Sequence, residues 1–212
     1  MDETIEKDQG LEEELEEESS ECSDNFDIYN SLAQDRFLFL SGDIVGDVAN
    51  KIVAWLLWLD KKSPTDEITI YINSDGGNIT NGLMTVYDTF QFIHAPIRTI
   101  CIGEAYSSAA VLLAAGSKGR RFAYPNSEVM IHTVQVSDIS GNQSQLEDES
   151  KRTKKLNASL MEIIARHSGQ SLSKVKRDCL KDKYMTAQEA LEYGLIDEII
   201  KPNKEVPALK KR

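Results

Sequence analysis

Short apolar segments alternate with amphipathic segments in the first half of the chain, and this alternation constrains the fold most strongly. Three short apolar segments are typical of strands, and they span residues 35–42, 67–73 and 97–102. The second is rich in β-branched residues, which indicates a buried strand. The two segments between them carry apolar residues at helical spacing. Gly103 is predicted to end the third strand, and a small-residue helix follows to Ala115. Strands that alternate with helices predict an α/β layer fold with parallel crossovers.

The second half contains shorter elements and one unusual helix. We expect strands in "EVMIH", around Val136–Ile139 and in "GLIDEII", and two short helices capped by Ser171 and Thr186. A longer helix is predicted from about Gln143 to His167. Its first half contains "EDESKRTKK" and has almost no apolar face, so burial in its own globule cannot hold it. It therefore projects into solvent or contacts another subunit.

Charge divides the chain into an acidic arm and a neutral remainder. Residues 1–25 hold twelve of the 35 acidic residues and one of the 24 basic residues, which leaves 23 of each sign elsewhere. Like charges repel in such an arm, so we expect it to be disordered or processed, serving as a solubilising tail or as a contact for a basic partner. We predict one folded domain over residues 26–202 and a basic, flexible tail over residues 203–212.

Composition also excludes several classes of protein. A neutral domain lacks the basic surface that nucleic-acid binding needs. No run approaches eighteen apolar residues, and the N-terminal residues resemble neither a secretory signal nor a transit peptide, so we expect no membrane contact. The three cysteines (Cys22, Cys101 and Cys179) are far apart and suggest neither a disulfide framework nor a zinc site. We therefore expect a cytoplasmic protein without a metal or cofactor.

The chain has only three histidines that could act as a general base. His94 and His167 lie near predicted helix ends, where a cation suits the helix dipole, so a structural role is expected. His132 differs because it ends an apolar strand, and α/β folds present functional groups at strand ends. By itself, a single histidine at a strand end is weak evidence for catalysis.

The segment "CIGEAYSSAAVLLAAG" gives a stronger signal. Ser107 and Ser108 lie where a strand turns into a helix, which exposes a hydroxyl near unpaired backbone N–H groups that can hold an oxyanion. A plain helix cap is the alternative. "SDGG", residues 74–77, ends the neighbouring strand and offers a second backbone donor. Together with His132, these groups would make an acyl-transfer site.

Several segments in order resemble the Clp protease proteolytic subunit. They are "YINSDGGNITNG", "CIGEAYSSAAVLLAAG", "GRRFAYPNSEVMIH", "GQS" and "MTAQEALEYGLIDEII". The resemblance runs from about Tyr29 to Ile200. It implies a serine endopeptidase on the α/β fold shared with crotonases, built of repeated β-β-α units with a projecting handle helix.

The same resemblance implies the roles of individual residues. Ser107 falls at the position of the nucleophile and His132 at that of the base. The triad aspartate is the second aspartate of "RDCLKD", so it falls on Asp182 rather than Asp178. The implied oxyanion donors are the backbone N–H groups of Gly77 and Ser108. Ser108 replaces a usual methionine and is expected to lend only its N–H.

Four departures from the family pattern affect the neighbourhood of the site. Asp75 replaces a proline before the glycine pair, and we expect the turn geometry to survive. The chain between Gly77 and Tyr87 is one residue longer than usual, which predicts a rotated helix or a bulge at its start. Tyr106 replaces an alanine and is expected to crowd the site. "TVQVSD" after His132 replaces a segment that binds substrate as an added strand in the family.

Assembly and partners are also implied by the resemblance. The family forms stacked heptameric rings, a tetradecamer, in which the handle helices interleave. The polar run Glu147–Lys155 suits such a contact, whereas Lys183 replaces an arginine that helps assembly. Unfolded polypeptides reach the chamber from a ring-shaped Clp-family AAA+ ATPase. This chain has no G-x-x-x-x-G-K-[ST] motif, so ATP-driven unfolding needs that partner.

Two other functions remain open from the sequence. One is a crotonase-like enzyme, in which paired N–H groups stabilise a thioester enolate and the serine, histidine and aspartate are not needed together. The other is a non-catalytic or weakly active ring subunit that works beside an active paralogue.

Overall fold

The structure is a computed structural model that describes residues 27–136 and 140–204, and its elements follow the predicted alternation. The strands are β1 (Phe37–Ser41), β2 (Ile68–Ser74), β3 (Ile97–Tyr106), β4 (Arg121–Ala123), β5 (Glu128–Ile131), β6 (Lys183–Thr186) and β7 (Glu198–Ile199). The α-helices are α2 (Ile28–Gln34), α3 (Gly46–Lys62), α4 (Thr85–Phe92), α5 (Ser108–Ala114), α6 (Gln143–Ser168), α7 (Leu172–Asp178) and α8 (Ala187–Tyr193). A π-helix, η1 (Ile79–Met84), precedes α4.

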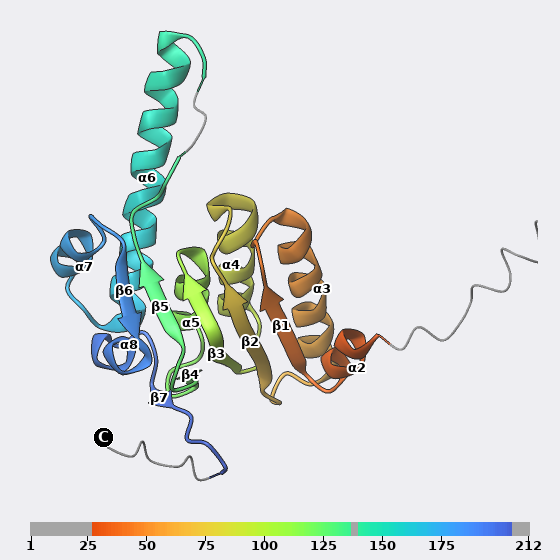
Figure 1. The fold of residues 1–212 in the computed structure, drawn as a ribbon. Helices are drawn as coiled ribbons and strands as arrows, with labels where there is room; N and C mark the ends of the chain where they lie inside the picture. Colours follow the sequence, from red (N-terminus) through yellow and green to blue (C-terminus); the bar gives the residue numbers. More distant parts are fainter. Residues whose placement is uncertain (1–26, 137–139, 205–212) are drawn as a thin grey trace, which may run out of the picture.

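The described strands form one sheet in the order β1-β2-β3-β4-β7, with β5 paired to β3 and β6 paired to β5. Every pair is parallel except β5 with β6. Helices α3, α4 and α5 lie on one face of this sheet (Figure 1). The predicted fold class, α/β with parallel crossovers, is therefore confirmed.

Strand β3 is longer than predicted, because Gly103 does not end it. The strand continues to Tyr106 and changes its partner from β4 to β5 beyond Gly103. The β2–β3 register shifts between Ile72 and Ser74, and the side chain of Asn73 fills the irregularity by accepting the Glu104 N–H at 3.2 Å. A Cβ on Gly103 would lie 2.3 Å from Asn73 Oδ1. Glycine therefore permits a bulge here instead of terminating the strand.

The helix after β2 begins with the predicted bulge. Residues Ile79–Met84 form the π-helical turn η1, in which the Leu83 N–H donates to the Asn78 carbonyl at 2.8 Å. An i→i+5 bond accommodates one residue more than an α-helical turn, and such turns are frequent at functional sites. The extra residue between Gly77 and Tyr87 is thus absorbed next to the glycine pair.

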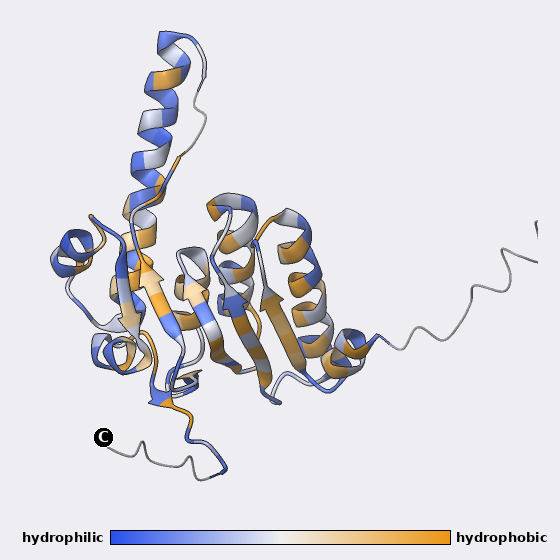
Figure 2. Cartoon of the chain, viewed as in Figure 1, coloured by the Kyte–Doolittle hydropathy of each residue, from blue (hydrophilic) through white to orange (hydrophobic). Residues whose placement is uncertain are grey.

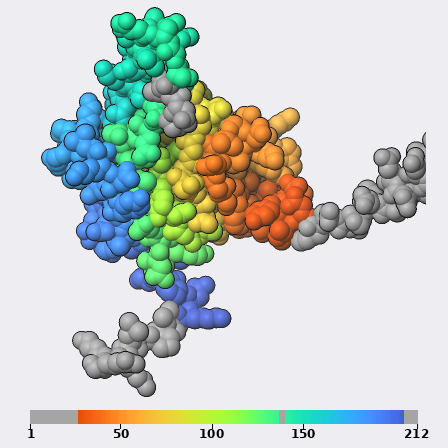
Figure 3. All heavy atoms as spheres, turned by 45° about the horizontal axis from the view of Figure 1, so that its top comes forward, coloured from red at the N-terminus to blue at the C-terminus, as the bar shows by residue number. Residues whose placement is uncertain are grey.

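Helix α6 projects from the body of the protein, as its composition predicts. Its first half is hydrophilic (Figure 2), and its N-terminal end projects beyond the other elements (Figure 3), whereas its buried residues are Leu160, Met161, Ile163 and Ile164 in the second half. A capping box between Asn142 and Gln145 starts the helix, and Gly169 in the left-handed conformation ends it. No helix in the described part of the chain is long and apolar enough to cross a bilayer.

Two predicted strands differ from the structure. Val136 lies outside any strand, and residues 137–139 lie outside the described part of the chain. The strand in "GLIDEII" is reduced to Glu198–Ile199, because its partner β4 is itself only three residues long. Both predicted caps are confirmed, since the hydroxyls of Ser171 and Thr186 accept N–H groups of α7 and α8.

A partly buried ion pair joins β4 to the last turn of the fold. The guanidinium of Arg121 donates to both carboxylate oxygens of Asp197, at 2.9 and 2.6 Å, and to the carbonyls of Ala114, His167 and Gly194. Burial alone would raise the pKa of Asp197, but the hydrogen bonds and charge of Arg121 hold that pKa below its ordinary value of 3.8. The pair therefore contributes stability above that value and loses it as the pH falls through the lowered pKa.

We predict that Arg121→Met lowers the free energy of unfolding by about 3 kcal/mol at pH 7, because it leaves Asp197 without its partner. Arg120→Met is the matched control, since Arg120 pairs with Glu67 at the surface and such pairs contribute about 0–1 kcal/mol. Urea unfolding of both variants measures the difference. Equal losses in the two variants would contradict the stabilising role of the buried pair.

Candidate active site

Ser107 occupies a strained corner between β3 and α5. Its backbone has φ 53° and ψ −120°, a left-handed conformation that costs a non-glycine residue about 1–3 kcal/mol. All seven residues of α5 are buried, and the Ser107 N–H donates to the Met130 carbonyl of β5 at 2.9 Å, so packing on both sides holds the corner. The Ser107 side chain makes no capping hydrogen bond to α5. The helix-cap alternative is therefore wrong for this residue.

The hydroxyl of Ser107 meets His132 instead. Ser107 Oγ lies 2.7 Å from His132 Nε2, within hydrogen-bond distance. His132 directly follows β5, which pairs with β3 at Tyr106 and Met130, so the sheet itself brings the two residues together. The imidazole side chain is 11% exposed and is therefore largely shielded from water. This arrangement gives Ser107 an adjacent proton acceptor.

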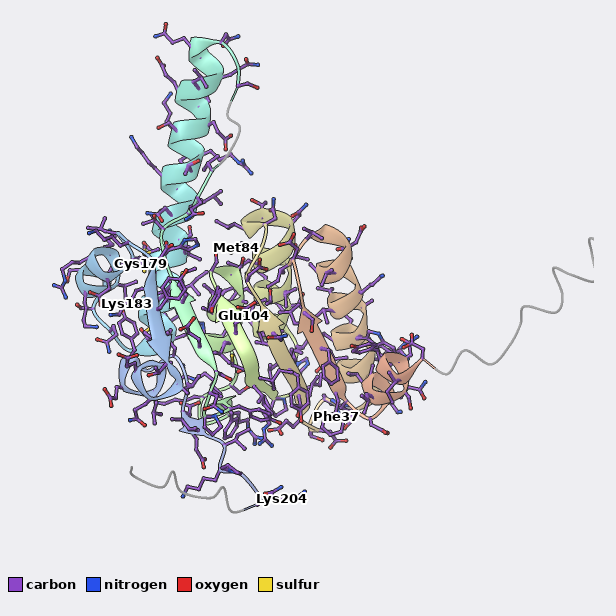
Figure 4. All side chains as sticks on the ribbon, viewed as in Figure 1. Phe37, Met84, Glu104, Cys179, Lys183 and Lys204 are labelled. Atoms are coloured by element: carbon purple, nitrogen blue, oxygen red, sulfur yellow. The ribbon has the colours of Figure 1, made fainter. Side chains whose placement is uncertain are left out.

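Asp182 lies on the other side of the imidazole. Its Oδ1 is 3.3 Å from His132 Nδ1, although the buried Nδ1 atom has no hydrogen bond of good geometry. We interpret this as a close approach of the two groups, and the Asp182 side chain is 46% exposed, which leaves it room to move. The Thr133 N–H donates to the Cys179 carbonyl at 3.0 Å and so fastens the end of α7 beside His132. Figure 4 labels Cys179 and Lys183, which lie on either side of residues 180–182 in the connection from α7 to β6.

Asp178 is directed elsewhere. Its Oδ2 accepts from Lys174 Nζ at 3.0 Å and from the Tyr193 hydroxyl at 3.2 Å. Burial would raise the pKa of Asp178, but these hydrogen bonds and the Lys174 charge lower it on balance. Of the two aspartates in "RDCLKD", the structure therefore brings Asp182 and not Asp178 to the imidazole.

The glycine pair lies against the same corner. Gly76 has φ +116°, and a Cβ there would lie 2.8 Å from Ser107 Cβ. Gly77 has φ +153°, and a Cβ there would lie 2.5 Å from the backbone nitrogen of Ile44. Both positions therefore require glycine. Despite Asp75, the turn brings the glycine pair against Ser107.

Two backbone N–H groups are free to bind an anion at this corner. The bridge between Ile44 and Gly77 uses the Gly76 carbonyl and the Asn78 N–H, and the Gly77 N–H has no acceptor among the described residues. The Ser108 N–H belongs to the first turn of α5, where helical amides lack intrahelical partners. Both amides belong to segments that contact the Ser107 corner, and unpaired N–H groups are what an oxyanion site needs.

The side chain of Ser108 makes a contact that the sequence gives no reason to expect. Its buried hydroxyl donates to the Gly77 carbonyl at 3.0 Å.

The expected crowding by Tyr106 is wrong, because Tyr106 does not line the cavity beside Ser107. Its hydroxyl donates to Glu128 at 2.5 Å and its ring contacts Tyr184 edge-on. The hydrogen bond to Glu128, with burial, raises the pKa of Tyr106.

A cavity of about 370 Å³ opens beside Ser107 and His132. Sequence analysis missed the part of its wall that comes from the middle of α6, including Glu149, Arg152 and Leu156. Arg152 pairs with Glu149 at 3.0 Å and reaches the Thr80 hydroxyl of η1 at 3.3 Å. Nothing in the local sequence distinguishes Arg152 from the charged residues of this helix that face solvent.

Asn157 of α6 was also missed by the sequence analysis. Its side-chain oxygen accepts the Val134 N–H at 3.1 Å and so holds the extended segment that follows His132. An asparagine within a helix gives no indication of this contact, because its partner lies 23 residues away in the sequence. The segment carries Val134, Gln135 and Val136 along the cavity wall.

The other two histidines lie away from the cavity. His94 is exposed and contacts Asp60. His167 accepts or donates a hydrogen bond with the Tyr87 hydroxyl at 3.0 Å, and burial, with the charges of Arg121 and Arg166, lowers its pKa. The structural role expected for His167 is consistent with this contact.

Comparison with protein families gives a match over most of the chain. A family model described as Clp protease matches residues 18–203. This range includes the serine corner, the glycine pair, His132 and Asp182.

The geometry predicts that Ser107 reacts selectively with a fluorophosphonate probe, because it has an adjacent base and Ser108 does not. Mass spectrometry of the labelled peptide distinguishes the two serines, and His132→Ala should slow labelling by about 10²-fold or more. His94→Ala is the matched control and should label at the wild-type rate. Modification of Ser108 in place of Ser107 would refute the assignment.

Proposed function

Since the chain belongs to the Clp protease family, we propose that it is a serine endopeptidase that uses Ser107, His132 and Asp182. The observation that carries this proposal is the 2.7 Å contact between the Ser107 hydroxyl and the imidazole of His132. A capping serine would direct its oxygen to the helix amides, whereas this one meets a base.

The proposed mechanism follows from the positions of these groups. Ser107 Oγ attacks the scissile carbonyl carbon while His132 Nε2 takes its proton, and the tetrahedral oxyanion binds the N–H groups of Gly77 and Ser108. His132 then gives the proton to the leaving amine, which leaves an acyl ester on Ser107. Water attacks this ester while His132 takes its proton, and His132 returns the proton to Ser107 Oγ as the acid is released. Asp182 holds the imidazole in the required tautomer and stabilises the imidazolium.

We also propose that the chain acts as the proteolytic core of a larger assembly. Stacked heptameric rings, with α6 at the contact between rings, would enclose the cavity beside Ser107. Unfolded polypeptides would then reach it only through a Clp-family AAA+ ATPase. The exposed first half of α6 supports this proposal, because a polar helix that projects from its own domain needs another contact to stay ordered.

A cytoplasmic location is part of the same proposal. The two cysteines in the described part of the chain, Cys101 and Cys179, are buried free thiols. Burial raises the pKa of Cys179 to about 12, so its thiol stays protonated and unreactive. Unpaired cysteines suit a reducing compartment.

The second candidate is a weakly active subunit that needs an active paralogue. One observation favours it: His132 Nδ1 approaches Asp182 without forming a hydrogen bond of good geometry. Cleavage of a fluorogenic peptide by the purified chain, with gel filtration on the same sample, separates the two candidates. Activity of the chain alone supports the first, and activity that appears only in a mixed ring supports the second.

We predict that Ser107→Ala abolishes measurable peptide cleavage and that Asp182→Asn lowers kcat roughly 10⁴-fold, because the imidazole loses its orienting carboxylate. Asp178→Asn is the matched control, since that carboxylate contacts Lys174 and Tyr193. It should retain kcat within a fewfold of the wild type. A large loss in Asp178→Asn with a normal Asp182→Asn enzyme would reverse the assignment of the aspartate.

A further inference from the structure

The hydroxyl of Ser108 connects the two segments that carry the proposed oxyanion donors. Ser108 is 2% exposed, and its Oγ donates to the Gly77 carbonyl at 3.0 Å across 31 residues of sequence. We call residues 74–78 the glycine loop. Among the described residues, this is the one direct hydrogen bond between the glycine loop and α5. The side chain of Ser108 therefore links the two residues, Gly77 and Ser108, whose N–H groups are the proposed oxyanion donors.

The other hydrogen bonds of the glycine loop join it to segments other than α5. The Ile44 N–H donates to the Gly76 carbonyl at 2.7 Å, and the Asn78 N–H donates to the Ile44 carbonyl at 3.0 Å. Ser74 Oγ donates to the Gly42 carbonyl at 2.6 Å and accepts the Gly76 N–H at 3.1 Å. These bonds fasten the loop to the connection between β1 and α3. Ser74 also pairs with Ala105 of β3, so the start of the loop is fixed near Ser107, whereas Gly77 is joined to α5 by the Ser108 hydroxyl.

The glycine of this bond lies just before an irregular helical turn. The π-helical turn η1 begins two residues after Gly77. Gly77 also has φ +153°, and glycine has the least intrinsic restriction on its backbone. The Gly77 carbonyl belongs to the peptide unit after Gly77, so the Ser108 bond fixes the orientation of that unit relative to the preceding one, which carries the Gly77 N–H.

We propose that the Ser108 hydroxyl is a positioning group that keeps the Gly77 and Ser108 N–H groups directed at one oxyanion. The inference rests on the proposed peptidase function. Donors must lie about 2.7–3.1 Å from the developing oxyanion, and they act mainly in the transition state. Loss of the hydroxyl therefore lowers kcat, whereas substrate binding in the ground state changes little.

Kinetics of Ser108→Ala with a fluorogenic peptide test this role. We expect kcat to fall about 10- to 100-fold, as is typical for loss of a supporting contact, with KM within twofold of the wild type. The rate of fluorophosphonate labelling at Ser107 should fall in parallel, because the probe forms a tetrahedral adduct at the same oxyanion site.

Ser127→Ala is the matched control. Ser127 is 4% exposed, and its hydroxyl donates to the Cys101 carbonyl at 2.9 Å, so it loses the same kind of buried bond at a site that does not line the cavity. Both variants should lose similar thermal stability, and Ser127→Ala should keep the wild-type kcat.

Ser108→Cys separates the hydrogen bond from packing. Cysteine fills nearly the same volume but is a weak donor, so kcat should lie near that of Ser108→Ala if the bond is what matters. A kcat equal to the wild type in both Ser108 variants, beside an inactive Ser107→Ala, overturns the positioning role and leaves the peptidase proposal intact. Failure of the wild type to cleave or label, alone and in a mixed ring, overturns the proposed function itself.

Discussion

The corner at Ser107 is the constraint on which the rest of the site depends. A serine at φ 53° is unfavourable by itself, so the surrounding structure must hold it. The Ser107 N–H is bound to β5 and the residues that follow Ser107 form the buried helix α5. Because His132 directly follows β5, one strand pairing both stabilises the corner and brings the imidazole to the hydroxyl.

The partner change along β3 makes that pairing possible. β3 pairs with β4 before Gly103 and with β5 after it, and the Asn73 side chain supports the irregular point between them. A strand that ended at Gly103 would leave β5 without its parallel neighbour. The bulge is therefore part of the architecture of the site, as bulges beside functional sites often are.

Helix α6 serves two regions of the molecule. Its second half is buried against the domain through Leu160, Met161, Ile163 and Ile164, whereas its first half projects. At the boundary, Arg152 and Asn157 turn toward the cavity and the segment after His132. The projecting residues and part of the cavity wall therefore belong to one continuous helix.

Local sequence by itself determined the alternation of strands and helices from β1 to α5, the caps at Ser171 and Thr186, the projecting character of α6 and the serine corner, but it did not indicate α2, β4 or β6. Periodicity, capping and backbone preferences act over a few residues, so they can be read along the chain. Family resemblance indicated Asp182, but only the tertiary structure placed Asp178 against Lys174 and Tyr193. It also decided that β3 continues through Gly103, that Ser108 bonds Gly77 and that Arg152 lines the cavity. These contacts join segments that are distant in the sequence, and their geometry depends on how the elements pack together.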